Sequence, residues 1–130
     1  ITELAARAEE LPEGTYLGTM GGKAAKYLLD EHRRGACGNM PACDIVDINA
    51  RIWNLLEKGE QTAAEELYTR ALPLTNMEYM YGHVLYKTVL KERGVIAHAC
   101  VRTGGDNTLD EFDMLELRRI LKTLEADFSA

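Results

Sequence analysis

The sequence has little of several features that would assign the protein to a particular class. Its three cysteines are odd in number, and their spacing fits neither a disulfide framework nor a C-x-x-C metal or redox motif. No apolar run approaches the roughly 20 residues that a membrane helix needs, and the first residues lack both the basic and the apolar part of a signal peptide. We therefore expect free thiols, no membrane partner and a cytoplasmic location.

Positive charge is also scarce. The 15 lysine and arginine residues are outnumbered by 21 acidic residues, which leaves a net charge of −6. A surface that neutralises nucleic-acid phosphates needs the opposite balance, so we expect no nucleic-acid partner. The 46% hydrophobic and 28% charged residues are those of an ordinary globular domain.

The first residues predict a short amphipathic helix over 2–11, with Thr2 as its N-cap. Its apolar stripe, which includes Leu4 and Leu11, has nothing before it to pack on, and Ile1 stands where a methionine is expected. We expect the chain to be a piece of a longer protein.

The next part of the chain predicts a βα repeat. Short apolar strands are expected at 16–20 and 35–37, on either side of an amphipathic helix over 23–34. In a parallel sheet the chemistry lies at the carboxyl ends of the strands, because those ends lead into the loops that approach a ligand. This pattern indicates Gly21-Gly22 and Gly38-Asn39 as the places to look for function.

The rest of the sequence has the apolar spacing of helices. Gly59 and Gly94 are placed to end two of them, and Pro73 is expected to kink its helix or to begin its last turn. The run 95–101 can be extended. The expected helices cover residues 44–58, a stretch that begins at about 61 and includes Pro73, and residues 77–93 and 109–128.

Two N-terminal caps are predicted for these helices. Asp44 with Asp47 is expected to cap the first helix. A T-x-x-E capping box formed by Thr108 and Glu111 is expected to open the last one.

The glycine-rich stretch 18–24 has some of the character of a phosphate-binding loop. The required G-x-x-x-x-G-K-[ST] pattern fails, because Gly18 is one residue too close and Ala24 has no hydroxyl for a metal. Two interpretations of Gly21 and Gly22 stay open. They can hold a carboxylate or let a substrate lie close to the backbone, or their role can be purely steric.

No metal site is predicted. The acidic run from Asp106 to Glu111 lacks the alternating ligands and the central glycine of a calcium loop. Cys37, at the expected end of the second strand, is by default a buried small hydrophobe and otherwise helps to line a pocket wall. The histidines each stand alone on their helical faces and are expected to be packed or exposed; they are His32, His83 and His98.

Several motifs, in order, resemble the C-terminal part of the dihydrodipicolinate synthase and N-acetylneuraminate lyase superfamily, the class I Schiff-base aldolases and dehydratases. The matching motifs are R-R-G-A-C-G-N-M-P at 33–41, G-x-x-x-x-A-x-x-L-Y-x-x-x-L-P-L at 59–74, the later Y-G-H-V-L-Y-K-x-V-L-K-E-R-G segment, and Arg102. The stretch G-A-C-G-N-M-P-A-C-D looks most like the branch that dehydrates 2-keto-3-deoxyarabonate.

The resemblance implies an α/β fold. The chain would hold the last two strands of a (β/α)8 barrel in residues 1–58 and a C-terminal helical extension in residues 59–130. It also implies a homotetramer and an upstream part of the barrel that carries the catalytic lysine and tyrosine. The residues agree with this, because all lysines lie in expected helices or at their ends, whereas a Schiff-base lysine belongs at a strand end in a dry pocket. These lysines are Lys23, Lys26, Lys58, Lys87, Lys91 and Lys122.

What the resemblance carries onto this chain is a pocket wall for a 2-keto acid, formed by Gly21, Gly22, Cys37 and Gly38. Other members often have a Gly-Asp pair where this chain has Gly21-Gly22, so the resemblance does not carry over their polar contacts to the distal end of the substrate. The small residues at Cys37-Gly38, beside the bound keto acid in the family, would leave room for a long polyhydroxy chain. The implied function is the dehydration of a 2-keto-3-deoxy sugar acid through a lysine imine, without metal or organic cofactor. The alternatives are a pyruvate-dependent aldolase and a non-catalytic helical interaction module.

Overall fold

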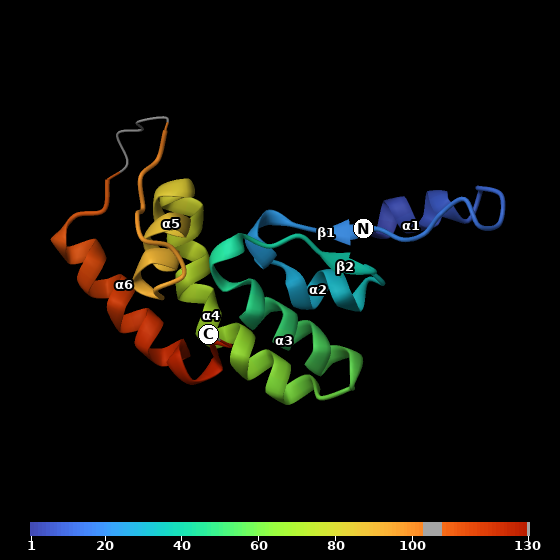
Figure 1. The fold of residues 1–130 in the computed structure, drawn as a ribbon. Helices are drawn as coiled ribbons and strands as arrows, with labels where there is room; N and C mark the ends of the chain where they lie inside the picture. Colours follow the sequence, from blue (N-terminus) through green and yellow to red (C-terminus); the bar gives the residue numbers. More distant parts are fainter. Residues whose placement is uncertain (103–107, 130) are drawn as a thin grey trace.

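The computed structural model describes residues 1–102 and 108–129, and it consists of a group of helices that carries a small parallel sheet (Figure 1). The elements follow in the order α1 (Thr2–Ala8), β1 (Met20–Gly21), η1 (Lys23–Ala25), α2 (Leu28–Arg33), β2 (Gly38–Asn39), η2 (Cys43–Ile45), α3 (Val46–Glu57), α4 (Gln61–Tyr81), α5 (His83–Glu92), α6 (Glu111–Leu124) and η3 (Glu125–Asp127). None of the described helices has the length and apolar character needed to cross a membrane.

Helix α1 buries none of its residues and lies apart from the other helices (Figure 1). It ends at Ala8, earlier than predicted, since no packing stabilises its last turn. The predicted cap at Thr2 is wrong, because Thr2 is already helical and Ile1 occupies the N-cap position without a side-chain bond.

The parallel βα arrangement is confirmed, but both strands lie further along the chain than predicted. Met20 pairs with Gly38, and Gly21 pairs with Asn39. Two further backbone bonds extend the pairing, from Cys37 N–H to the Thr19 carbonyl (2.9 Å) and from Met40 N–H to the Gly21 carbonyl (3.0 Å). The expected strand 16–20 pairs only at its end, where the two backbones meet.

The prediction of one helix over 23–34 is wrong at its start. Lys23, Ala24 and Ala25 have left-handed φ values of 52°, 57° and 62°, so they form a separate turn, and α2 begins only at Leu28. This turn redirects the chain after β1 and buries Ala25 in the core. The predicted stop at Gly35 is confirmed by its φ of 80°.

Helices α3 and α4 form an antiparallel hairpin (Figure 1). The turn between them contains Gly59 with φ 76°, as predicted. Pro73 neither ends α4 nor opens its last turn, since the helix continues to Tyr81 and breaks at Gly82. Packing in the core stabilises the helix on both sides of the proline, because Ala71 and Leu74 are 3% and 0% exposed.

The cap of α6 differs from the prediction. Asp110 is the N-cap, and it forms the box with Asp113: the Asp113 N–H donates to Asp110 Oδ1 (2.9 Å), and the Asp110 N–H donates to Asp113 Oδ2 (3.0 Å). Thr108 lies before the helix, and the start of the acidic run from Asp106 lies outside the described residues. The stop at Gly94 is confirmed by its φ of 74°, while 95–101 forms no strand.

The core joins the βα unit to the helices. It lies between α2, α3, α4, α5 and α6, and the stripe predicted for the last helix contributes Leu117, Leu121 and Leu124. The fully buried large side chains include Leu28, Ile45, Ile48, Ile52, Leu74, Leu85, Leu117 and Leu124.

Candidate functional site

A carboxylate from α2 lies at the carboxyl ends of both strands. Asn39 Nδ2 donates to Glu31 Oε2 at 2.5 Å, and the Gly22 N–H donates to Glu31 Oε1 at 3.3 Å. Gly21 is buried, and a Cβ at this position would overlap the Glu31 carboxyl group. Gly22 thus holds a carboxylate through its backbone amide, while Gly21 has a steric role.

Gly38, in β2, and Cys37, the residue just before β2, lie beside this cluster. A Cβ at Gly38 would meet Met20 Cε at 3.2 Å, and one at Gly18 would overlap the Cys37 side chain. The default prediction that Cys37 is a buried small hydrophobe is wrong, because its side chain is exposed. The predicted site residues are therefore brought together at two adjacent strand ends.

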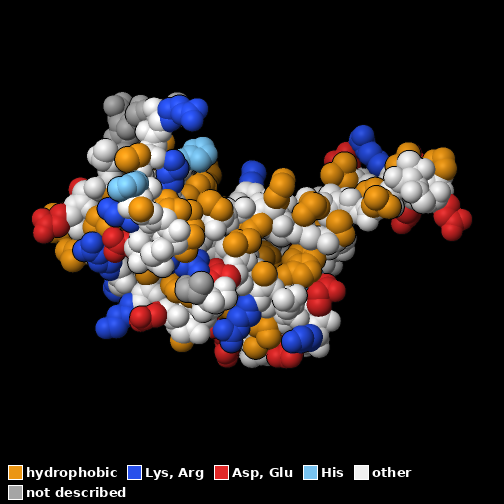
Figure 2. Space-filling view, viewed as in Figure 1, with side chains coloured by type: hydrophobic (Ala, Val, Ile, Leu, Met, Phe, Trp, Pro, Cys, Tyr) orange, Lys and Arg blue, Asp and Glu red, His pale blue; other side chains and the backbone are white. Residues whose placement is uncertain are grey.

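The surface around the sheet is strongly apolar. Leu17, Met20, Met40 and Val46 are 92%, 55%, 70% and 51% exposed, and hydrophobic side chains gather over the region of β1 and β2 (Figure 2). A hollow of about 250 Å³ opens here; its lining includes Met20, Leu28, Gly38, Asn39, Val46 and Trp53.

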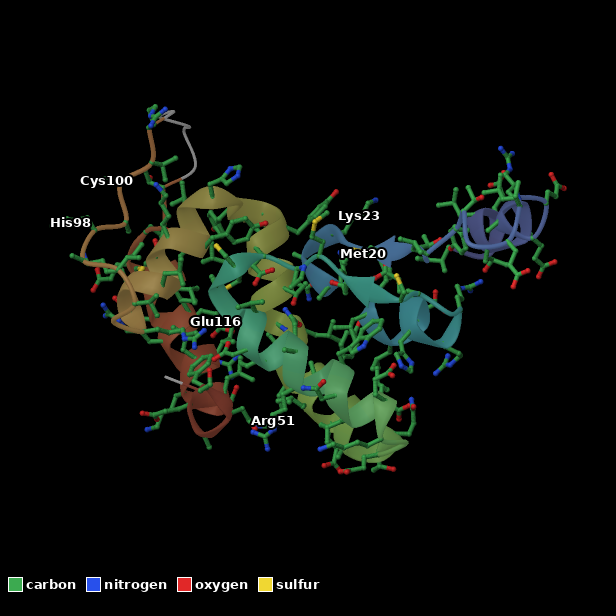
Figure 3. All side chains as sticks on the ribbon, turned by 45° about the vertical axis from the view of Figure 1, so that its right-hand side comes forward. Met20, Lys23, Arg51, His98, Cys100 and Glu116 are labelled. Atoms are coloured by element: carbon green, nitrogen blue, oxygen red, sulfur yellow. The ribbon has the colours of Figure 1, made fainter. Side chains whose placement is uncertain are left out.

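A second cavity, of about 390 Å³, lies just beyond the end of β1. The turn after β1 contributes lysines to it, and Lys23 lies close to Met20 at this strand end (Figure 3). Helix α4 and the start of α5 form the opposite wall. The residues around the cavity include Lys23, Lys26, Tyr27, Thr75, Glu78, Tyr79 and Tyr86.

Glu78 and Asp44 form a buried carboxyl pair behind this cavity. They are 1% and 0% exposed, and among the described residues no donor forms a hydrogen bond to their side-chain oxygens. Burial, together with the nearby Asp44, raises the pKa of Glu78 to about 9. Burial also raises the pKa of Asp44, although the adjacent Glu78 and Arg93 side chains oppose this. Because two carboxylates cannot both be ionised in so dry a place, the pair shares one proton at neutral pH.

Asp44 and Asp47 do not cap their helix, so this prediction is wrong. Asp44 turns inward to Glu78, and no side-chain bond caps η2 or α3. Asp47 instead accepts from Arg93, with Oδ1 at 3.1 Å and Oδ2 at 2.6 Å. Burial alone would raise the pKa of Asp47, but the hydrogen bonds from Arg93 and the Ser129 backbone lower it. Arg93 also donates to the Asp44 carbonyl, so it joins η2, α3 and α5.

Removing the Asp47 charge tests this junction. The paired side chains are 8% exposed for Arg93 and 14% for Asp47, so Asp47→Asn leaves a nearly buried guanidinium unpaired, and we expect a loss of about 3 kcal/mol in the free energy of unfolding. Urea denaturation measures this loss. The matched control is Asp30→Asn, which breaks the exposed pair with Arg34 and is expected to leave the midpoint unchanged. Equal effects of the two changes would contradict the prediction.

The histidines take packed or surface positions. His32 Nε2 lies 2.8 Å from Glu57 Oε1, and its ring meets Trp53 edge-on at 4.9 Å. His83 meets Tyr86 edge-on at 5.8 Å, and His98 is exposed. Within residues 1–102 and 108–129, no three histidine, cysteine or acidic side chains come together as metal ligands.

Comparison with known proteins identifies one similar architecture. No family model and no curated protein matches the sequence. Among solved structures, the crystal structure of dihydrodipicolinate synthase from Rhodopseudomonas palustris matches with a TM-score of 0.81 and 26% sequence identity, over 93% of this chain. The chain is similar to part of a dihydrodipicolinate synthase. It spans 40% of the length of that synthase chain.

The match supports the superfamily resemblance found in the sequence. The alignment extends over 93% of this chain.

Sequence reasoning missed Glu31 and the Asp44–Glu78 pair. Glu78 gave a usable signal, because it continues the apolar face of Leu67, Ala71 and Leu74 at helical spacing, and a carboxylate on such a face is unusual. Asp44 gave none, since an acidic residue before a helix is most simply interpreted as a cap.

Proposed function

We propose that this chain is the C-terminal part of a lyase of the Schiff-base aldolase and dehydratase superfamily. The observation that carries the proposal is the likeness to dihydrodipicolinate synthase over 93% of this chain and 40% of that chain. In this proposal β1 and β2 are the last two strands of a (β/α)8 barrel. The exposed apolar side chains around the sheet support it, because the remaining strands of a barrel would pair with its open edges and cover its exposed face.

The proposed organisation follows from this placement. Residues 1–58 belong to the barrel, and residues 59–130 form a helical domain that takes part in a homotetramer. The upstream part of the barrel is then the first partner of this chain, and the cytoplasm is the proposed location.

The proposed substrate is a 2-keto-3-deoxy sugar acid such as 2-keto-3-deoxyarabonate. An upstream lysine condenses with the keto group and releases water, which forms an imine. A proton then leaves the carbon beside the imine, the electron pair moves toward the imine nitrogen, and the neighbouring hydroxyl departs as water. Hydrolysis of the resulting conjugated imine returns the lysine. The imine is the electron sink, so this reaction needs no metal or organic cofactor.

The residues of this chain act in the proposal as a pocket wall. Cys37 and Gly38 bring little bulk to the end of β2, which leaves room for a polyhydroxy chain. Gly21 and Gly22 shape the neighbouring strand end by making space for Glu31 and binding it.

Borohydride trapping in the full-length parent protein tests the proposal. We expect 2-keto-3-deoxyarabonate to leave a reduced adduct on a lysine outside residues 1–130, detected by mass spectrometry, and to be dehydrated by the untreated protein. A pyruvate adduct together with carbon–carbon bond formation would favour the aldolase alternative, which the dihydrodipicolinate synthase match also supports. Absence of an adduct with either compound would overturn the Schiff-base function.

A further inference from the structure

A third cavity, of about 570 Å³, lies between the end of α5, the second half of α6 and the segment that follows α6. None of its lining residues belongs to β1, to β2 or to the turn after β1, so it is separate from the strand ends and from the cavity beyond β1. Its volume falls in the range of about 300–1,000 Å³ that is usual for small-molecule sites.

Arg93 brings a hydrogen-bond donor without an acceptor to this cavity. Its side chain lines the cavity and is 8% exposed. Both Nη atoms donate to the Asp47 carboxylate, and the guanidinium Cζ lies 4.0 Å from the centre of the Phe128 ring. The buried Nε–H has no acceptor within the described residues. A buried donor without a partner is costly, so a group that accepts from Nε would bind favourably.

Two side chains of opposite charge also line the cavity without a partner. Lys122 lies in the last turn of α6 and Glu125 in η3. Neither forms an ion pair within the part of the chain that the structure describes. Arg118 and Glu92, which also line the cavity, are bound to each other at 2.9 Å. The cavity therefore offers one free ammonium and one free carboxylate to a ligand.

These charges select a zwitterionic ligand. Arg93 and Arg118 are each balanced by a carboxylate, so a ligand with a net charge would leave one charge of the site unpaired. A zwitterion brings one group of each sign. Its carboxylate would accept from Lys122 and from Arg93 Nε, which are charge-assisted hydrogen bonds, and its ammonium would donate to Glu125.

The apolar part of the cavity selects the rest of the ligand. Leu121 is 9% exposed and belongs to the core, and Phe128 packs against that core. Both line the cavity. A short aliphatic group on the ligand would lose water-exposed apolar surface by packing against them.

We propose that this cavity is a binding site for an α-amino acid with a short aliphatic side chain, with its carboxylate on Lys122 and Arg93 Nε and its ammonium on Glu125. The inference uses only contacts within this chain, so it does not depend on the Schiff-base function. A ligand bound here joins α5 to α6 and to the segment after α6.

Isothermal titration calorimetry of the full-length parent protein tests the ligand class, with L-leucine as the probe. Two analogues each lack one of its charges: 4-methylpentanoate has no ammonium, and 3-methylbutylamine has no carboxylate. We expect leucine to bind and both analogues to bind at least tenfold more weakly. The proposal is overturned if leucine does not bind, or if either analogue binds as tightly as leucine.

Variants of the full-length protein, with folding checked by circular dichroism, test the position of the site. Lys122→Ala and Glu125→Gln are each expected to weaken leucine binding at least tenfold, whereas Lys122→Arg keeps the charge and is expected to bind within about threefold of the parent. The matched controls are Lys91→Ala and Glu66→Gln, because both residues are exposed and lie outside the cavity; they are expected to leave binding unchanged. Leucine binding that persists in Lys122→Ala and Glu125→Gln would overturn the assignment to this cavity. Borohydride trapping reports on the Schiff-base function and is expected to be the same in all these variants.

Discussion

Glu78→Gln is expected to make the chain more stable above neutral pH and to remove part of the pH dependence of its folding. In the folded chain burial raises the pKa of Glu78 from 4.5 to about 9, so folded Glu78 keeps a proton that the unfolded chain has released. Its contribution to stability is fully present below about pH 4.5 and is lost as the pH rises toward 9, by about 1.4 kcal/mol per pH unit.

Glutamine cannot ionise, and its amide can donate to an ionised Asp44. The variant and the parent are therefore expected to be about equally stable at pH 4.5 and to differ by about 3 kcal/mol at pH 7, in favour of the variant. Urea unfolding between pH 4.5 and 9 measures the difference. Asp47, whose pKa is lowered, contributes an opposite slope at acid pH, but it does so in both proteins.

Glu66→Gln is the matched control, because Glu66 is exposed on the same helix. It is expected to follow the parent at every pH. A Glu78→Gln curve parallel to that of the parent would show that the Asp44–Glu78 pair does not share a proton.

Gly21→Ala is expected to be the most disruptive small change at the strand ends. The added Cβ would overlap the carboxyl group of Glu31 and crowd Asn39 Nδ2, so Glu31 must leave its place between β1 and β2. It then loses its hydrogen bonds to Gly22 and Asn39. We expect a loss of about 2 kcal/mol in the free energy of unfolding, within the range seen for overpacking.

A double-mutant cycle tests directly whether Gly21 and Glu31 interact. Glu31→Ala creates the space that the methyl group added by Gly21→Ala needs. The loss in the free energy of unfolding of the double variant Gly21→Ala/Glu31→Ala is therefore expected to be smaller than the sum of the two single losses by at least about 1 kcal/mol. Gly22→Ala is the control, since a Cβ there meets only the Met40 carbonyl oxygen at 3.9 Å. Strict additivity would mean that Gly21 and Glu31 do not meet.

The strand-end part of the site could be predicted from the sequence. A βα unit places the carboxyl ends of its strands side by side, and Gly21-Gly22 and Gly38-Asn39 do lie at the ends of β1 and β2. What could not be predicted is the group that lies between them. Glu31 belongs to α2, the helix that connects the strands. The direction in which its side chain points depends on where α2 begins, and the left-handed turn at Lys23 to Ala25 decides that start.

The cavity beyond β1 could not be predicted either. It needs η1, α4 and α5 to meet, and no local pattern specifies those distances. Asp44 shows the reason. A carboxylate before a helix can cap that helix locally, but burial beside Glu78 and the hydrogen bond from Arg93 to the Asp44 carbonyl favour an inward position.

The sequence by itself determined the features that depend on one residue or on a regular period. Gly35, Gly59 and Gly94 end helices because glycine adopts positive φ without a steric penalty, and the 3,4 spacing of the last helix places its leucines in the core. Tertiary structure decided the features in which local preferences compete with packing. Helix α4 continues through Pro73 because buried neighbours stabilise it, and the carboxyls of Asp44 and Glu78 share a buried position that neither residue specifies alone.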